Sequence, residues 1–178
     1  MLTLRCTLSL LKQLGSGAGV GAESPPSGLL GDWDAKVVAA RPQRLVLCTN
    51  ERTLLCVVVP FAPARELRQR FGAAAQRLIQ RLPVSPALVD REVAALNDIA
   101  FGRATNRSVR SSMTHFGYAV DAWLASDRPR DLDALSLWLC DTPCFPLRTT
   151  WPWLEAELVL TGEVASGSRP FKFKGPVD

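Results

Sequence analysis

Two apolar runs separated by a short polar segment constrain the fold of this chain most strongly. Residues 44–49 and 54–59 are rich in Leu, Val and Cys, and the four residues between them, Asn50-Glu51-Arg52-Thr53, are typical of a turn. The pattern predicts a β-hairpin over about residues 44–59. Because both runs are apolar at nearly every position, we expect both faces of this hairpin to be covered. Helices could cover both faces, or helices could cover one and a partner the other.

Further strands and helices are predicted around this hairpin. Apolar and polar residues alternate over 1–7, and residues 33–40 and 99–104 are further strand candidates, the last one at a sheet edge. Helical spacing, caps and prolines predict helices over 7–14, 63–82, 86–96, 108–125 and 132–139, and after residue 150. The predicted fold class is α+β: a small, mostly antiparallel sheet of four to five strands with a central hairpin, packed against a cluster of helices that covers one sheet face.

The chain length of 178 residues suits one domain, predicted over residues 1–165. Residues 166–178 are predicted to be a mobile tail, and residues 15–28, rich in Gly and Pro, are predicted to be a flexible loop. No apolar run approaches the ~20 residues that a membrane span needs, so no membrane association is predicted. The alternating start is not typical of a signal peptide, and the five cysteines are an odd number. These features predict free thiols and a cytoplasmic location.

Neither a metal site nor a catalytic group is predicted. The chain has one histidine, His115, and its only close cysteine pair is Cys140 and Cys144. A zinc site needs three or four converging ligands, so we expect no metal and no cofactor. A nucleophile with a histidine partner would have to use His115, which the helical spacing favours as a partly buried structural residue. The sequence leaves catalysis open but favours a protein without it.

The best candidate for a binding site is the arginine-rich start of the helix predicted over 108–125. Asn106 and Ser108 are both suitable N-cap residues, and the first N–H groups of a helix can hold an anion. The alternative is that these residues only cap the helix and that the arginines pair with nearby carboxylates. The predicted anion- or ligand-binding residues are Arg103, Thr105, Asn106, Arg107, Ser108, Arg110, Ser112 and His115.

Several segments together resemble a bacterial family that is known only as a domain of unknown function, DUF6933. The matching segments are residues 1–7, 30–33, 45–54, 105–109, 112–113 and 142–144. The resemblance implies no activity, because the family has none to transfer. Similar sequences tend to carry an aromatic residue in place of Asp34 and Asn-Asp in place of Thr114-His115, so a polar role of that pair would be altered in this chain.

Three hypotheses for function follow. The first is a non-catalytic module that binds a ligand or partner through an anion site near residues 105–112. The second is association with nucleic acid through the basic middle of the chain, where residues 61–114 carry 9 − 4 = +5 charges; it would use Arg70, Arg77, Arg81, Arg103, Arg107 and Arg110. The third is an enzyme that acts on a phosphorylated substrate through Arg107, Ser108 and His115. The partner is not predicted, and the apolar hairpin leaves a homodimer open.

Overall fold

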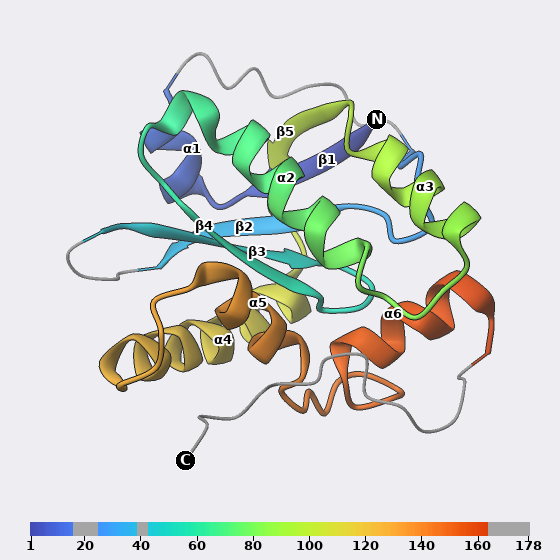
Figure 1. Cartoon of the computed structure of the whole chain (residues 1–178). Coiled ribbons are helices and arrows are strands. Elements are labelled where there is room, and N and C mark those ends of the chain that lie inside the picture. Colours follow the sequence, from blue (N-terminus) through green and yellow to red (C-terminus); the bar gives the residue numbers. More distant parts are fainter. Residues whose placement is uncertain (16–24, 39–42, 164–178) are drawn as a thin grey trace.

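The computed structural model describes residues 1–15, 25–38 and 43–163. It contains a five-stranded sheet between helices (Figure 1), with strands β1 (Leu2–Cys6), β2 (Trp33–Val38), β3 (Leu45–Asn50), β4 (Cys56–Pro60) and β5 (Ile99–Arg103). The predicted tail, most of the Gly- and Pro-rich loop and the last two residues of the second predicted strand lie outside the described residues.

The sheet is mixed, so the expectation of a mostly antiparallel sheet was wrong. The strand order is β4-β3-β2-β1-β5; β1 runs parallel to both of its neighbours, while β2–β3 and β3–β4 are antiparallel. The predicted hairpin is confirmed as β3–β4, but β4 lies at an edge of the sheet. The parallel pairs arise because helices separate their strands along the chain. Helix α1 (Leu8–Leu14) connects β1 to β2, and a parallel neighbour requires such a crossover.

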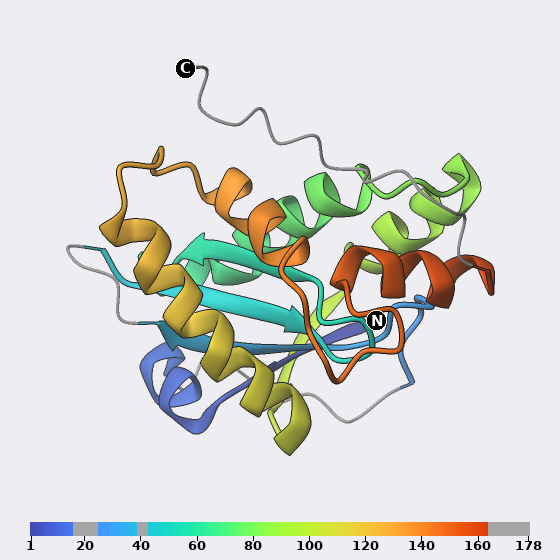
Figure 2. The same cartoon turned by 90° about the horizontal axis from the view of Figure 1, so that it is seen from below.

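Helices cover both faces of the sheet, not only one (Figures 1 and 2). Short helix η1 (Ala64–Glu66) leads into α2 (Leu67–Ile79), which lies on one face together with α3 (Pro86–Ala95). On that face, Phe71 of α2 packs edge-on against Trp33 of β2, with ring centroids 5.4 Å apart, and both side chains are fully buried. Since the same chain covers both faces of the hairpin, the apolar runs no longer argue for a partner copy.

The other face carries α4 (Arg107–Ala125) and α5 (Leu132–Cys140), and α6 (Pro152–Thr161) follows. Of the two predicted caps of α4, Asn106 is the one used: its side-chain oxygen accepts hydrogen bonds from the backbone N–H groups of Ser108 (3.1 Å) and Val109 (3.3 Å). The predicted apolar stripe of α4 faces the sheet and is buried at Val109, Met113, Phe116, Val120 and Trp123.

Helix α5 covers the free edge of β4. The backbone N–H of Val58 donates to Ser136 Oγ (2.9 Å), and the backbone N–H of Cys56 donates to Cys140 Sγ (3.2 Å). Residues 136 and 140 are one helical turn apart, so one face of α5 satisfies two edge groups that would otherwise be open to pairing with another chain. Across the described ranges, no helix combines the length and apolar character needed to span a bilayer.

Candidate functional site: a cationic pocket beside helix α4

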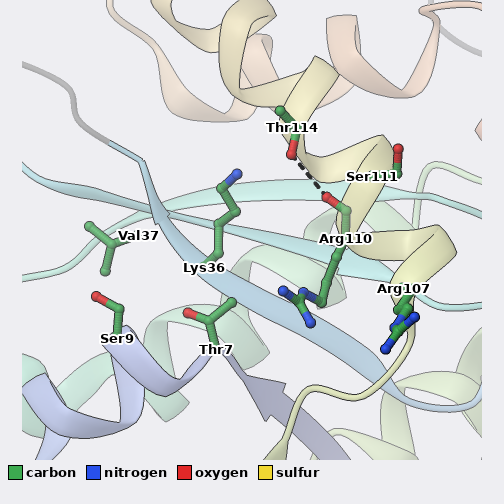
Figure 3. Close-up of a pocket in the computed structure, with 8 residues that line it drawn as sticks. All are labelled: Thr7, Ser9, Lys36, Val37, Arg107, Arg110, Ser111 and Thr114. Carbon is green, nitrogen blue, oxygen red and sulfur yellow. Dashed lines mark hydrogen bonds between the residues drawn. The ribbon is translucent and has the colours of Figure 1, made fainter.

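An open pocket of about 530 Å³ lies between the start of α1, strand β2 and the first two turns of α4 (Figure 3). It is lined by Thr7, Ser9, Lys36, Val37, Arg107, Arg110, Ser111 and Thr114. Lys36 rises from β2, and Arg110 reaches down from α4 toward the same strand. Three cationic side chains and four hydroxyl groups therefore surround one cavity.

The three cations of this pocket converge on one cavity without a carboxylate partner in the described part of the chain. Among the residues that the structure describes, Lys36, Arg107 and Arg110 form no ion pair within 4.0 Å. Some arginines elsewhere are neutralised; Arg77, for example, binds the carboxylate of Asp133 through two hydrogen bonds of 2.8 and 2.9 Å. Because like charges that converge without counter-charges repel one another, the pocket has a local positive potential that an anion would relieve.

The tip of helix α4 offers fewer unpaired N–H groups to an anion than the sequence suggested. Asn106 occupies the backbone N–H groups of Ser108 and Val109, which would otherwise face a ligand. The pocket instead lies along the flank of the helix, where Arg107, Arg110 and Thr114 follow one another at helical spacing. The Thr114 hydroxyl donates to the carbonyl oxygen of Arg110 (3.1 Å), which fixes the rotamer of one pocket hydroxyl (Figure 3).

The structure divides the predicted site residues into three groups. Arg107 and Arg110 line the cationic pocket. Ser108, Ser112 and His115 line a second cavity of about 470 Å³ on another flank of α4, which the segment from Thr142 to Pro146 closes. The remaining three, Arg103, Thr105 and Asn106, line neither cavity.

The second cavity does not provide an activated nucleophile. Cys144 and His115 both line it, but burial raises the pKa of the Cys144 thiol to about 11, so the thiol is protonated at neutral pH. His115 is exposed, which corrects the expectation of a partly buried structural histidine. The trio suggested for an enzyme is also divided, since Arg107 faces one cavity while Ser108 and His115 face the other.

A row of buried polar side chains lies under the start of α4, next to the cationic pocket. Arg5 of β1 and Asp34 of β2 are paired in register, so their side chains project from the same face of the sheet. Arg5 Nη2 lies 2.9 Å from Asp32 Oδ2, and Arg5 Nε lies 3.3 Å from Glu51 Oε1. Lys36, two residues after Asp34, projects from this face as well and lines the pocket.

Asp34 differs from other buried carboxylates of the protein. Each of three other buried carboxylates accepts a hydrogen bond from the backbone. Asp32 accepts from the N–H of Thr3 (2.8 Å), and Glu155 accepts from the N–H of Thr149 (3.0 Å). Glu92 accepts from the N–H groups of Leu29 (2.6 Å) and Leu30 (3.1 Å). These three carboxylates hold loops and strand ends in place. Asp34 is fully buried, yet neither of its oxygens accepts a hydrogen bond from any residue that the structure describes.

The surroundings of Asp34 favour its protonated form. Burial, and then the charge of the neighbouring Glu51 carboxylate, raise the pKa of Asp34 to about 7, although the positive charges of Arg5 and Arg110 act in the opposite direction. A carboxyl group with such a pKa changes charge near neutral pH, which is characteristic of functional sites but also occurs in structural ion networks.

Sequence reasoning missed most of the pocket. Thr7, Ser9 and Lys36 come from segments about 70 to 100 residues before α4, and local patterns do not show which strand lies beneath which helix. Strand alternation could have placed Asp34 and Lys36 on the same face of β2. Two charged residues on one face of a largely buried strand are unusual. Such a pair is a signal for a polar site.

The arginines of the basic middle segment do not form one surface. Arg70 and Arg77 belong to α2, on the sheet face opposite α4 (Figure 1). Arg70 Nη2 is 2.8 Å from Glu66 Oε2, and Arg77 is bound to Asp133. A single basic stripe across these residues and those of α4 is therefore absent from the described part of the chain.

The fold places the chain among α+β proteins with a five-stranded mixed sheet, and the described residues contain no group of three or more His, Cys, Asp or Glu side chains that could hold a metal ion. The family model described as "Domain of unknown function (DUF6933)" matches residues 3–155, so the chain belongs to this family and its suspected membership is confirmed. The match begins within β1, ends within α6 and includes all eight residues that line the cationic pocket. No curated protein matched the sequence.

Proposed function

We propose that the protein binds a phosphorylated small molecule or a similar oxyanion in the cationic pocket and does not transform it. One observation carries this proposal: Lys36, Arg107 and Arg110 converge on one cavity without a carboxylate partner within 4.0 Å among the described residues. A phosphate group would supply the missing negative charge.

The donors around the pocket suit a tetrahedral oxyanion. Arginine presents planar N–H donors that match two oxygens of a phosphate group, and lysine adds a compact point charge. The hydroxyl groups of Thr7, Ser9 and Ser111 can donate to further oxygens. The pocket is open to solvent, so its affinity depends on charge and is expected to fall with salt.

The pocket supports binding better than catalysis. Its eight lining residues include no Asp, Glu, His or Cys, so no side chain of the lining can exchange a proton with a reacting group near neutral pH. General acid–base catalysis needs such a group within hydrogen-bond reach of the substrate. The second hypothesis, nucleic-acid binding, is less well supported because the basic residues lie on two faces of the sheet.

The location proposed for this function is the cytoplasm. All five cysteines are free and buried, and burial raises the pKa of each thiol. Unpaired thiols are typical of a reducing compartment such as the cytoplasm.

Calorimetric titration with pyrophosphate at low and at moderate salt tests the proposal. We expect saturable binding that weakens with salt, and a loss of about 10- to 100-fold in affinity in Arg107→Ala, the range for one charged hydrogen-bond donor. Arg91→Ala is the matched control, since Arg91 is an exposed arginine of α3 on the other sheet face. The proposal is wrong if pyrophosphate does not bind, or if both variants lose affinity equally.

A thermal unfolding series with the same anion provides a second readout. A ligand at one hundred times its dissociation constant stabilises the folded protein by about 2.7 kcal/mol. Inorganic phosphate, nucleoside monophosphates and a short DNA duplex, compared at equal ionic strength, would then indicate which phosphorylated ligand the pocket prefers. Stabilisation by the duplex alone would favour the nucleic-acid alternative.

A further inference from the structure

The buried carboxylate of Asp34 lies in the layer directly beneath the cationic pocket. It shares a sheet face with Lys36, two residues along β2, and Arg110 reaches from α4 down toward the same strand (Figure 3). The positive charge of Arg110 acts on the Asp34 carboxylate, so the two groups are electrostatically coupled. Arg110 therefore both lines the cavity and interacts electrostatically with the buried acid.

Within the described ranges, Asp34 lacks the backbone contacts through which other buried carboxylates hold this fold together. A buried carboxylate that stabilises a fold accepts hydrogen bonds, as Asp32 and Glu92 do from backbone N–H groups. Both oxygens of Asp34 lack such donors among the described residues, although the side chain is completely buried. Burial of an ionised carboxylate in that position costs folding free energy, which the charges of Arg5 and Arg110 offset only in part.

We propose that Asp34 regulates the anion pocket: when ionised, its carboxylate offsets the charge of Arg110 and weakens the binding of an anion, and when protonated it leaves the full charge of Arg110 available. This inference rests on the proposed function, since it describes how the same pocket is controlled. Asp34 does not line the pocket, so it acts through Arg110 and not by touching the ligand.

The direction of the effect follows from charge alone. Adding a proton to Asp34 removes a negative charge near the bound anion, so the affinity for an anion is higher below the pKa of Asp34 and lower above it. That pKa, raised by burial and by Glu51 to about 7, places the change between about pH 6 and pH 8. By reciprocity, a bound anion must raise the pKa of Asp34, and binding near pH 7 must take up protons.

The charged neighbours of Asp34 from every packed element support this assignment. Arg5 comes from β1, Glu51 from the turn after β3, and Arg110 from α4. Lys36 lies on the same strand. Arg5 is held near Asp32 and Glu51 at 2.9 and 3.3 Å, which leaves Arg110 as the cation that can respond to a ligand. His115 lines the second cavity and not this pocket, so its replacement serves as a control.

Sulfate is the probe that isolates this effect, because it stays a dianion between pH 6 and pH 8 while phosphate changes its own charge. Calorimetry would measure sulfate affinity at pH 6 and at pH 8 in the wild-type protein, in Asp34→Asn and in His115→Ala. We expect wild-type affinity to fall about tenfold from pH 6 to pH 8, the usual size of such couplings. Asp34→Asn should bind with the higher affinity at both pH values, and His115→Ala should behave like the wild type.

Proton uptake gives a second readout that a merely structural residue would not change. Titrations near pH 7 in two buffers of different ionisation enthalpy should show protons taken up with sulfate by the wild type and none by Asp34→Asn. If wild type and Asp34→Asn lose affinity in parallel, or if neither depends on pH, the regulation by Asp34 is refuted while the anion pocket stands. If the wild type binds no sulfate at any pH, both the pocket and its regulation are refuted.

Discussion

The two faces of the sheet serve different purposes. On the α2 face, Trp33, Ala35 and Phe101 meet the apolar side of the helix, and Phe71 fills the space above them. On the α4 face, the same strands present Arg5, Asp34 and Lys36 under the start of the helix. Residues alternate along β1 and β2, so these two strands place apolar side chains on one face and polar ones on the other, whereas β3 and β4 are largely apolar on both faces.

This difference shows where stability and where binding are located. Burial of aromatic and aliphatic side chains on the α2 face stabilises the domain, whereas unpaired charges on the α4 face cost free energy. Natural proteins tolerate such a cost where a ligand needs it. Substitutions on the α2 face should therefore change unfolding free energy, and those in the cationic pocket should change anion affinity.

The largest effect is expected for Phe71→Ala on the α2 face. The fully buried ring contacts Trp33, and its removal leaves a cavity, which should lower the free energy of unfolding by about 3–5 kcal/mol. Chemical denaturation would measure this loss, and pyrophosphate titration of the folded variant should give an unchanged dissociation constant. A stability loss below about 1 kcal/mol would contradict the assigned core.

Asp34→Asn should change how stability depends on pH. The folded-state pKa of about 7 lies above the unfolded value of 3.8, so the folded protein binds more protons between these two pH values. Its unfolding free energy therefore falls as pH rises from about 4 to about 7, by at most about 4 kcal/mol. Denaturation at pH 5 and pH 8 should show this fall in the wild type and a smaller one in Asp34→Asn. If the unfolding free energy falls equally with pH in the wild type and in Asp34→Asn, another titrating group is responsible for the fall.

A smaller loss is expected for Ser136→Ala at the edge of β4. The substitution removes the acceptor of the Val58 N–H and leaves a buried donor unsatisfied, which costs about 1–3 kcal/mol. Hydrogen exchange of the Val58 amide should accelerate more than that of the neighbouring strand β3. An unchanged exchange rate at Val58 would show that α5 does not protect this edge.

The smallest effect is expected for the N-cap of α4. Asn106→Ala should lower the unfolding free energy by about 1 kcal/mol, because two backbone N–H groups lose their acceptor. Ser108→Ala is the matched comparison, since Ser108 is exposed and inside the helix, and it should change stability by less than about 0.5 kcal/mol. A larger stability loss in Ser108→Ala than in Asn106→Ala would show that Ser108, and not Asn106, caps the helix.

Local sequence patterns predicted the helices and strands well, but they predicted the pairing of the strands in the sheet poorly. The apolar spacing that begins at Val109 and the paired apolar runs around residues 50–53 correspond to α4 and to the β3–β4 hairpin. The neighbours of β1 could not be predicted, because strand order depends on contacts between distant segments, and β5 lies more than 90 residues after β1. The expected sheet was therefore mostly antiparallel where the observed one is mixed.

The candidate site could be predicted only on the side of α4. Arg107 and Arg110 were recognised because they are close together in the sequence, whereas Lys36 and Thr7 enter the pocket through tertiary packing. The same packing places Ser112 and His115 in a different cavity, although they are only a few residues from Arg110. Helical periodicity separates residues that look adjacent in the sequence.

The most direct test of the cationic pocket is a pyrophosphate titration followed by the backbone amide resonances of the isotope-labelled protein at low salt. A ligand held between β2 and α4 should produce saturable shifts at residues 36–37 and 107–114, with little change in α2 or α3. The same shifts should need about 10- to 100-fold more pyrophosphate in Arg107→Ala and an unchanged concentration in Arg91→Ala. Shifts that are absent, or that centre on α2 or α3, would contradict the assignment of this pocket as the binding site.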